Sequence, residues 1–589
     1  MYRYMKAVEK KTISVETKIF WGILVVAFLV RVIGIGSMPY GVNQDEAMLA
    51  MDAWALSEYG TDRYGTFMPV HFTAWKYGQM SVLLAYLMVP FIKVLGFSTF
   101  AVRLPMAIVG TLGVALMYLI SRKVFSGKMF SGNGFGGNEV SGEVTAKKMA
   151  LAVMALTAVN PWQIMQSRWA LDCNLFPHVF LLGFYLLLLG LEKRRYLYLS
   201  MVCFGLTFYC YGIAIYTVPV FLFVYAAWCL WKKQLPFRDI LISVVIFVCV
   251  ALPEVITMAI NMFGGSTIET PFFTMCYFPE SIRSTDILFL NFSVTQLGKN
   301  IWALISKVFL QMPDHLFNAL PAFGPLYHIS IPFILVGIVQ FTRNLFREKD
   351  VKKQTVDLAL WGFLITGIWA GLITKEVNVN RINIIFYPLI LLCGYGIWIV
   401  LQWFCICLEK KSAEKATGAE PAMDVEQVNV AEATKNVREK CSIAGRVIMF
   451  AYGACAVLFC ATYVTSFAEQ IQTYFNVDFL EITAQADALE EYDSLYITGN
   501  MHWQYNLSMS EILTQYSCKI DALYYQEKTN ETGGRSLLPY SERYHFVNME
   551  KHDFADKDGL YIVEINEVKY LPAGYEVILV NDSFVAVQL

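Results

Sequence analysis

Residues 239–261 read DILISVVIFVCVALPEVITMAIN, and such a long apolar run is typical of a transmembrane helix. A helix needs about 20 predominantly apolar residues to cross the hydrocarbon core of a bilayer. Ten further runs of this kind occur along the chain, at residues 19–35, 101–121, 149–165, 175–191, 197–212, 215–231, 327–342, 357–374, 382–408 and 445–466. The sequence therefore predicts an all-α polytopic membrane protein with about eleven transmembrane helices.

The overall composition also indicates a membrane protein. Hydrophobic residues make up 56% of the chain and charged residues only 16%, whereas soluble domains carry about 25% charged residues. The net charge of −2 and the pI of about 6.4 give no sign of a nucleic-acid partner. None of the 13 cysteines shows C-x-x-C spacing, so neither a disulfide framework nor a zinc site is indicated.

The distribution of Lys and Arg predicts the topology, because these residues gather in cytoplasmic loops. Segment 79–97 is also apolar, and its placement decides which loops face the cytoplasm. If it lies on the outer side as an interfacial helix, the cytoplasmic stretches hold 28 Lys and Arg; these stretches are 1–18, 121–148, 192–196, 232–238, 343–354 and 408–446. We therefore expect a multi-pass protein of the cell membrane with a cytoplasmic N-terminus and an extracytoplasmic C-terminus.

The chain changes character near residue 467. Short β-rich runs alternate there with polar stretches, at residues 494–498, 522–525, 544–547, 560–564, 576–580 and 584–588, and the last two flank a hairpin turn over residues 581–583. We expect a transmembrane domain over residues 1–466 and a small soluble α/β domain over residues 467–589 on the outer face.

The first outer loop carries the most informative polar residues. The helix at 19–35 contains Arg31 near its end, and Asp45 and Glu46 follow after a short Gly/Pro linker. Adjacent carboxylates at an apolar interface have raised pKa values, which suits a general base. The alternative interpretation is an acidic pair at a helix start, where it meets the positive end of the helix dipole.

Four other polar connections open on the same face in this topology. They are residues 71–79 with His71 and Lys76, residues 101–105 with Arg103, residues 167–174 with Arg168 and Asp172, and residues 378–383 with Arg381. Charged residues at membrane depth are functional candidates, although a single arginine would also reach the headgroups by snorkelling. Several cations around carboxylates suit a substrate whose leaving group is a phosphate.

The order of these motifs resembles the GT-C superfamily of integral membrane glycosyltransferases. The closest branch is the protein O-mannosyltransferase and aminoarabinose-transferase-like one. The resemblance covers residues 20–405 and leaves the C-terminal domain outside. One departure concerns Lys76, which is followed by Tyr77-Gly78-Gln79 instead of Pro-Pro-Leu. The matching motifs are Val30-Arg31-Val32, Pro39, Asp45-Glu46, Leu95-Gly96, Val102-Arg103-Leu104-Pro105, Ser167-Arg168-x-Ala170 and Arg381 before Tyr387-Pro388-Leu389.

The resemblance implies transfer of a sugar from a polyprenyl-phosphate donor to an acceptor hydroxyl on a glycan, protein or lipid, with inversion. In a bacterial host the membrane lipid carrier would be undecaprenyl phosphate. Asp45 would take the acceptor proton, and Glu46 would orient an arginine or the acceptor. The remaining substrate-binding residues would be Lys76, Arg103, Arg168, Asp172 and Arg381, with the arginines neutralising the departing phosphate.

No cofactor is predicted. Asp45, Glu46, Asp172 and His71 would hold a divalent metal ion only if the fold brings them together, and their spacing does not show that. The alternative functions are a lipid-linked oligosaccharide polymerase or ligase, a polyprenyl-lipid flippase or transporter, and a membrane-anchored binding module. The early Asp-Glu pair favours the transferase, and we find no internal repeat of the kind many transporters have.

Overall fold

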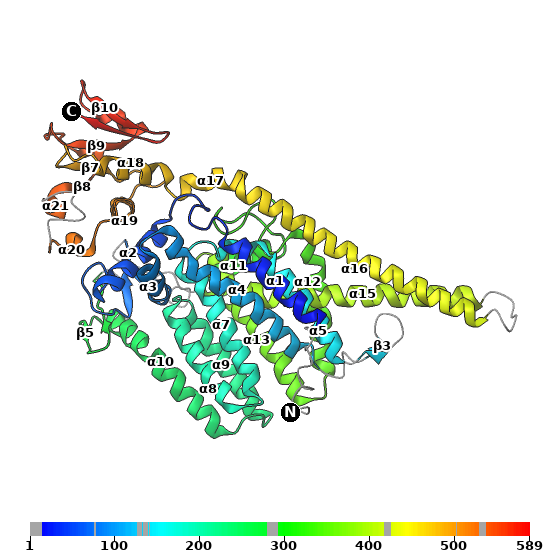
Figure 1. Ribbon diagram of the computed structural model, residues 1–589. Helices are drawn as coiled ribbons and strands as arrows, with labels where there is room; N and C mark the ends of the chain where they lie inside the picture. Colours follow the sequence, from blue (N-terminus) through cyan, green and yellow to red (C-terminus); the bar gives the residue numbers. More distant parts are fainter. Residues whose placement is uncertain are drawn as a thin grey trace, which may run out of the picture.

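The computed structural model describes residues 14–75, 78–126, 132–133, 139–140, 142–279, 293–417, 426–501, 503–528 and 538–589. Lys76 lies outside these residues. Helices form a large bundle, and a small domain with a β-sheet sits at one end of it (Figure 1). This arrangement confirms the predicted fold class.

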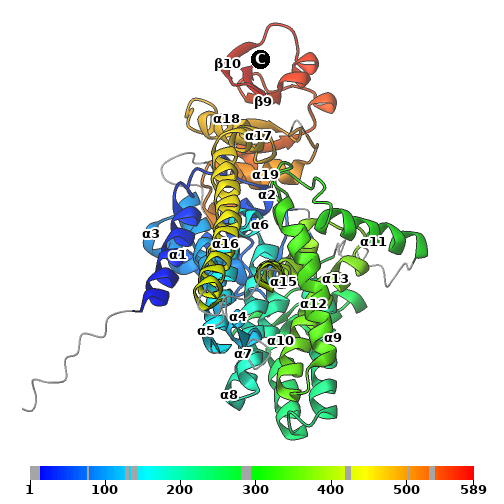
Figure 2. The same cartoon turned by 90° about the vertical axis from the view of Figure 1, so that its right-hand side faces the viewer.

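Eight helices in the described part of the chain are long and apolar enough to cross a membrane. The most apolar is α10, with a mean hydropathy of 2.6 over its central window. These helices pack side by side in the bundle (Figures 1 and 2). They are α4 (Thr99–Val124), α7 (Asp172–Gly190), α9 (Ala214–Trp231), α10 (Phe237–Phe263), α12 (Ile331–Arg347), α13 (Val351–Ile373), α15 (Phe386–Thr417) and α16 (Glu426–Val464).

Three other predicted spans form helices that are shorter or more charged. Helix α1 (Val15–Val32) has 18 residues and carries Arg31 in its last turn, α5 (Gly142–Ala158) has 17 residues, and α8 (Arg194–Leu206) has 13. A length of 13 residues gives about 20 Å of helix, less than the ~30 Å hydrocarbon core. The count of about eleven transmembrane helices therefore stays a prediction.

The first loop folds into a compact group of short elements. Helix α2 (Gln44–Tyr59) packs on α3 (Leu83–Leu95), and the strands β1 (His71–Thr73) and β2 (Gln79–Ser81) form an antiparallel hairpin between them. Helix α3 covers the apolar segment whose crossing was in question; it has 13 residues and contains Pro90. These elements lie at the end of the bundle that carries the small C-terminal domain, and we call this end the domain end (Figure 1).

Several connections at the domain end are short helices rather than open loops. Asn160 caps α6 (Pro161–Gln166) by accepting from the N–H of Gln163, and the proline occupies the first turn, where no intrahelical donor is needed. Helix α14 (Val379–Ile382) and the 3-10 turn η5 (Asn383–Ile385) lead into α15. The amphipathic helix α11 (Val294–Val308) packs on α13.

The C-terminal domain contains a mixed five-stranded sheet in the order β10-β11-β9-β7-β8. Strand β7 is parallel to β8 and β9, and β11 is antiparallel to β9 and β10. The strands are β7 (Leu495–Thr498), β8 (Tyr544–Val547), β9 (Leu560–Glu564), β10 (Glu576–Val580) and β11 (Phe584–Gln588). The predicted hairpin over residues 581–583 is confirmed, since β10 and β11 flank it.

Helices α18 (Val477–Asp487), α19 (Leu507–Ser517) and α21 (Tyr540–Arg543) pack on the sheet of the C-terminal domain. The domain also contains α17 (Ser466–Tyr474), which joins α16 to α18, and α20 (Ala522–Tyr525). The prediction of a strand at residues 522–525 is wrong, because Asp521 caps this segment as the short helix α20 by accepting from the N–H of Leu523.

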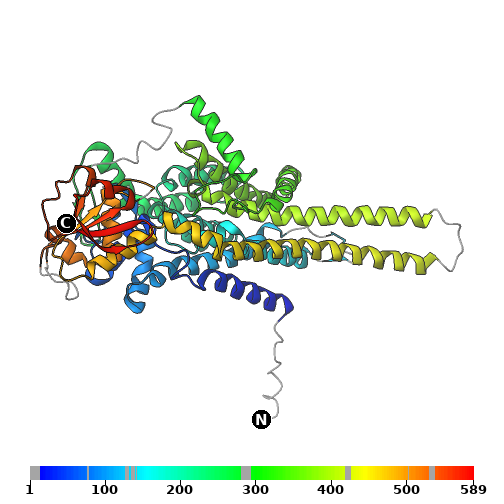
Figure 3. The ribbon, with the colours of Figure 1, turned by 90° about the horizontal axis from the view of Figure 1, so that it is seen from above.

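Helices α15 and α16 run side by side as a long hairpin that extends beyond the rest of the bundle (Figure 3). Cys405 and Cys441 form a disulfide that joins the two helices. Cysteine spacing gave no indication of this bond, because the two residues are 36 positions apart and meet only when the hairpin closes.

Candidate functional site

Helix α2 begins at the acidic pair of the first loop. Asn43 caps the helix, and its side-chain oxygen accepts a hydrogen bond from the backbone N–H of Asp45 at 3.0 Å. Asp45 and Glu46 thus occupy the first turn, where carboxylates meet the positive end of the helix dipole. The acidic pair therefore lies at a helix start, as the alternative interpretation expected. The surroundings of the two side chains nevertheless differ.

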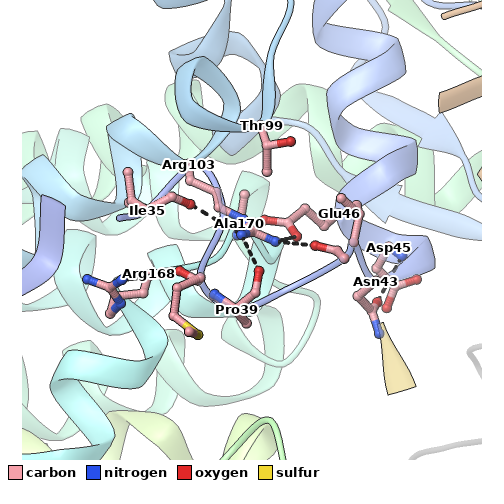
Figure 4. Close-up of polar contacts among 12 residues, drawn as sticks. Ile35, Pro39, Asn43, Asp45, Glu46, Thr99, Arg103, Arg168 and Ala170 are labelled. Atoms are coloured by element: carbon pink, nitrogen blue, oxygen red, sulfur yellow. Dashed lines mark hydrogen bonds and ion pairs between the residues drawn. The ribbon is translucent and has the colours of Figure 1, made fainter. Parts of the chain in front are cut away.

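Glu46 is completely buried and pairs with Arg103 of α4 (Figure 4). The guanidinium of Arg103 donates to both carboxylate oxygens, from Nε at 2.8 Å and from NH2 at 2.7 Å. Glu46 Oε1 also accepts from the backbone N–H of Ala170 at 2.7 Å. Glu46 therefore orients an arginine, one of the two roles expected from the family resemblance, and ties α2 and α4 to the segment before α7.

Arg103 uses its remaining donors on backbone carbonyls of the first loop. It donates to Ile35 O at 3.2 Å, Pro39 O at 2.8 Å and Gly41 O at 2.8 Å, and its exposed fraction is 0%. A guanidinium has five N–H donors, and these bonds, with the two to Glu46, occupy them all. The expectation that Arg103 binds the donor phosphate therefore does not match its contacts.

Arg168 lies next to this loop and also binds backbone carbonyls. It donates to Val30 O at 2.6 Å, Ile33 O at 2.9 Å and Met38 O at 3.2 Å, and its guanidinium lies 5.4 Å from the centre of the Tyr463 ring. A cation is favourable at the C-terminal end of α1 because the last carbonyls of a helix carry partial negative charge. Arg168 is 4% exposed, so it does not snorkel to the membrane surface.

Arg31 is bound in a similar way. It donates to Ala27 O at 2.7 Å, to Ala158 O at 3.3 Å and to the side-chain oxygen of Gln163, and it is completely buried. Ala158 is the last residue of α5, so Arg31 joins the ends of α1 and α5. Arg31 thus fixes α1 to α5 and α6, whereas Arg168 binds carbonyls at the start of the first loop.

Asp45 is only half-buried and is oriented by an aromatic side chain. The indole N–H of Trp75 donates to Asp45 Oδ1 at 2.5 Å. Among the described residues, no group donates to the second oxygen, Oδ2. One oxygen of Asp45 is thus held in place while the other can accept a proton, which is the geometry that a general base needs.

The β-hairpin that carries Trp75 is fixed to the membrane bundle by a buried pair. Nδ1 of His71 in β1 lies 2.7 Å from Oε2 of Glu254 in α10, and both side chains are buried. Glu254 was not among the residues expected from the sequence, although a carboxylate inside an apolar run is itself a signal of a function. His71 therefore lies against α10 rather than with Asp45 and Glu46.

No group of three or more His, Cys, Asp or Glu side chains arranged to hold a metal ion occurs among the residues that the structure describes. The four candidate ligands are separated in the fold, because His71 pairs with Glu254 and Glu46 pairs with Arg103. The residues that are present therefore do not form the metal site that was considered from the sequence.

The start of α7 meets the segment before α15. Asp172 is the first residue of α7, is 4% exposed and accepts from the N–H of Cys173 at 2.6 Å. The side-chain amide of Asn383 donates to Cys173 O at 2.6 Å. Arg381 lies two residues before Asn383, is half-buried and donates to Glu376 O at 3.0 Å. The fold thus brings the Asp172 and Arg381 connections together.

Asp314 is a further acidic residue at the domain end that sequence analysis missed. Its Oδ2 accepts from the N–H of Val379 at 2.8 Å, and its Oδ1 accepts from the amide of Asn318 at 3.3 Å. Lys307 lies 3.7 Å from the same carboxylate. Asp314 therefore fixes the loop after α11 to the helix that carries Arg381, and only the fold could show this contact.

Several buried side chains in these connections have polar atoms without a hydrogen-bond partner among the described residues. They include the amide of Gln166, the indole N–H of Trp169, the amide nitrogen of Asn174 and the amide oxygen of Asn383. Buried polar atoms in folded proteins are nearly always hydrogen-bonded. These atoms therefore indicate that the domain end contacts water or a polar substrate.

The bundle and the domain at its end share the fold of solved integral membrane glycosyltransferases of the GT-C class. More particularly, the chain is similar over nearly its whole length to one solved member of that class, ArnT from Cupriavidus metallidurans bound to undecaprenyl phosphate. The TM-score is 0.55 with 13% sequence identity, and 97% of each chain is covered. The likeness therefore extends past residues 20–405 and includes the C-terminal domain.

A second solved structure shows the same fold. The oligosaccharyltransferase of Archaeoglobus fulgidus in the apo form matches with a TM-score of 0.50 and 10% identity, over 85% of this chain and 64% of that one. In sequence, no family model matches and no curated protein matches. The shared property is thus the GT-C fold, and the activity has to be argued from the site.

Proposed function

We propose that this multi-pass membrane protein is a glycosyltransferase that moves a sugar from a polyprenyl-phosphate donor to an acceptor hydroxyl. The observation that carries the proposal is Asp45, whose Oδ1 is held by Trp75 and whose Oδ2 has no partner among the described residues, in a chain with a GT-C fold. The open oxygen suits proton abstraction.

The reaction is a displacement at the anomeric carbon. The acceptor oxygen forms a bond to this carbon while the bond from the carbon to the phosphate oxygen breaks, so the configuration inverts. The acceptor proton passes to Asp45 Oδ2, and the lipid phosphate leaves with the electron pair. A phosphate needs little protonation to leave, so one base together with electrostatic stabilisation of the phosphate is sufficient.

We assign different roles to the cations of the site. Arg103 and Arg168 act as positioning residues, because their donors bind the carbonyls of the first loop. Arg381 and Lys76 are the residues that we propose for the donor phosphate. Arg381 is half-buried at the domain end, in the connection that meets the start of α7. Asp172, the first residue of α7, is proposed as a further substrate-binding residue.

The carrier lipid is proposed from the comparison with ArnT, which is described as bound to undecaprenyl phosphate. We propose the same carrier for this protein.

The topology proposal is unchanged: the N-terminus is cytoplasmic and the domain end faces outward. The proposed domains are residues 1–466 and 467–589, and α17, which begins at Ser466, lies at this boundary.

The second candidate function is transfer of a lipid-linked oligosaccharide, which the fold of the archaeal oligosaccharyltransferase supports. Purified protein incubated with synthetic undecaprenyl-phosphate monosaccharides and with lipid-linked oligosaccharides separates the two. We expect sugar transfer or donor hydrolysis with the monosaccharide carriers. Turnover of oligosaccharide donors alone would favour the second candidate, and turnover of neither would contradict both. Lipid analysis of a deletion strain would identify the carrier that accumulates.

A further inference from the structure

The C-terminal domain contacts the first loop three residues before Asp45. The turn between α17 and α18 contains Phe475 and Asn476. The backbone N–H of Val42 donates to Phe475 O at 2.8 Å, and the side-chain amide of Asn476 donates to Val42 O at 3.4 Å. Both polar groups of the Val42 backbone are thus bound by two consecutive residues of the C-terminal domain.

Gly41 shows how closely the two segments approach. Its φ angle is +74°, and a Cβ atom at this position would overlap the Phe475 carbonyl oxygen and lie 2.8 Å from Val477 Cγ2. On the other side, Gly41 O accepts from Arg103 at 2.8 Å. The end of the first loop is therefore held between Arg103 of the membrane bundle and the Phe475–Asn476 turn.

The Phe475 ring extends the contact to the other connections of the site. The ring is completely buried, with its centre 5.3 Å from the Trp169 ring and 6.4 Å from the Phe317 ring. Trp169 precedes Ala170, whose N–H binds Glu46. One aromatic side chain of the C-terminal domain thus packs against two connections of the domain end.

Asn476 has a left-handed backbone conformation. Its φ angle is +55°, a region that glycine and asparagine adopt more readily than other residues. The side chain is buried, and its oxygen accepts from the indole N–H of Trp503 at 3.3 Å. Both ends of the amide are therefore used, with the donor directed at Val42.

We propose that Phe475 and Asn476 are positioning residues of the transfer reaction, so that the C-terminal domain completes the catalytic site. The proposal rests on the proposed function of Asp45. Val42 precedes Asn43, the cap that holds the N–H of Asp45. A shift of this segment therefore moves Asp45, and a misplacement of about 1 Å costs on the order of 10²-fold in rate.

Two substitutions at Asn476 test the proposal. Asn476→Gly keeps the backbone conformation and removes the amide, and Asn476→Asp keeps the shape but places an acceptor against Val42 O. We expect kcat to fall at least about 10-fold in both, with the donor KM within about twofold of wild type, since only the position of the base changes.

Tyr516→Phe is the matched control. Tyr516 belongs to the same domain, and its hydroxyl bonds to Thr99 of α4 at 2.8 Å rather than to Val42. Burial raises the pKa of Tyr516 to about 12, so this hydroxyl stays protonated. Removing it weakens domain docking without touching the turn, and we expect at least half of the wild-type kcat.

A second measurement does not depend on turnover. Hydrogen exchange of peptides covering residues 41–46 should be faster in Asn476→Gly and unchanged in Tyr516→Phe. The proposal would be overturned by unchanged exchange in Asn476→Gly, or by unchanged kcat in either Asn476 variant of an active enzyme. A loss of kcat in Tyr516→Phe equal to that in the Asn476 variants would also overturn it. Faster exchange in a protein that transfers no sugar would support the contact and contradict the proposed function instead.

Discussion

Trp75 and Asp45 form a hydrogen bond of 2.5 Å that sets the orientation of the proposed base. Trp75 follows strand β1, whose His71 is bound to Glu254 of α10, so the base is positioned from the membrane bundle through the hairpin. The contact leaves Oδ2 of Asp45 without a partner among the described residues.

Asp45→Asn should fold normally and lose nearly all transfer. Removal of a general base costs about 10²–10⁴-fold in rate, and asparagine keeps an oxygen that accepts from Trp75. The measurement is transfer from a synthetic polyprenyl-phosphate sugar, with thermal unfolding as the check on folding. Turnover close to wild type would place the base elsewhere, and Asp172 would be the next candidate.

Trp75→Phe should reduce kcat by about 10-fold, because it keeps an aromatic ring and removes a charge-assisted hydrogen bond worth roughly 1.5–3 kcal/mol. The expected effect is smaller than that of Asp45→Asn. In the Asp45→Asn background, the further effect of Trp75→Phe should be small, since the two residues act together. Independent, multiplying effects would show that Trp75 acts through some other residue.

Glu46→Gln should lower stability more than Asp45→Asn does. Breaking a buried ion pair by removing one partner costs about 3–5 kcal/mol, and Glu46 and Arg103 are both completely buried. Thermal unfolding in detergent or nanodiscs measures the difference. Equal unfolding temperatures for Glu46→Gln and wild type would mean that the pair does not hold the loop.

Arg103→Lys and Arg381→Lys should have different effects. Lysine cannot reproduce the planar fork of arginine, so Arg103→Lys should lower the unfolding temperature because five bonds in the first loop are disturbed. Arg381→Lys should unfold like wild type and raise the donor KM. A raised donor KM with normal stability in Arg103→Lys would restore Arg103 as a phosphate ligand.

The topology prediction is tested with single cysteines in a background without exposed cysteines. Lys233 lies in a predicted cytoplasmic connection and Lys557 in the C-terminal domain, and both are exposed. An impermeant reagent added to intact cells should label Lys557→Cys and not Lys233→Cys. Labelling of both, or the reverse pattern, would contradict a cytoplasmic N-terminus with an outer C-terminal domain.

The class of fold could be predicted because apolar runs of about 20 residues carry their own signal. The acidic pair was also recognisable, since a Gly/Pro linker places it directly after the first helix. The contacts of Arg103 and Arg168 could not be predicted, because most of their partners are backbone carbonyls, which no side-chain pattern reveals. An unpaired arginine and one bound to three carbonyls look the same in sequence.

Contacts between distant segments account for the other omissions. His71 and Glu254 are 183 positions apart, and Val42 and Asn476 are 434 apart. Periodicity and charge place each residue on a helix or in a loop, but they do not say which loops touch. The C-terminal domain was therefore left without a role by the sequence, although it lies directly on the first loop in the structure.

The contact between Val42 and Phe475 also bears on how the protein is made. The chain is synthesised from its N-terminus, so all the membrane helices have been made while the first loop still lacks the carbonyl that binds Val42. The loop acquires that partner only after the last segment has been translated and has reached the same side of the membrane. A nascent chain or a truncated product that ends before residue 475 would thus have its membrane helices but lack this contact with the first loop.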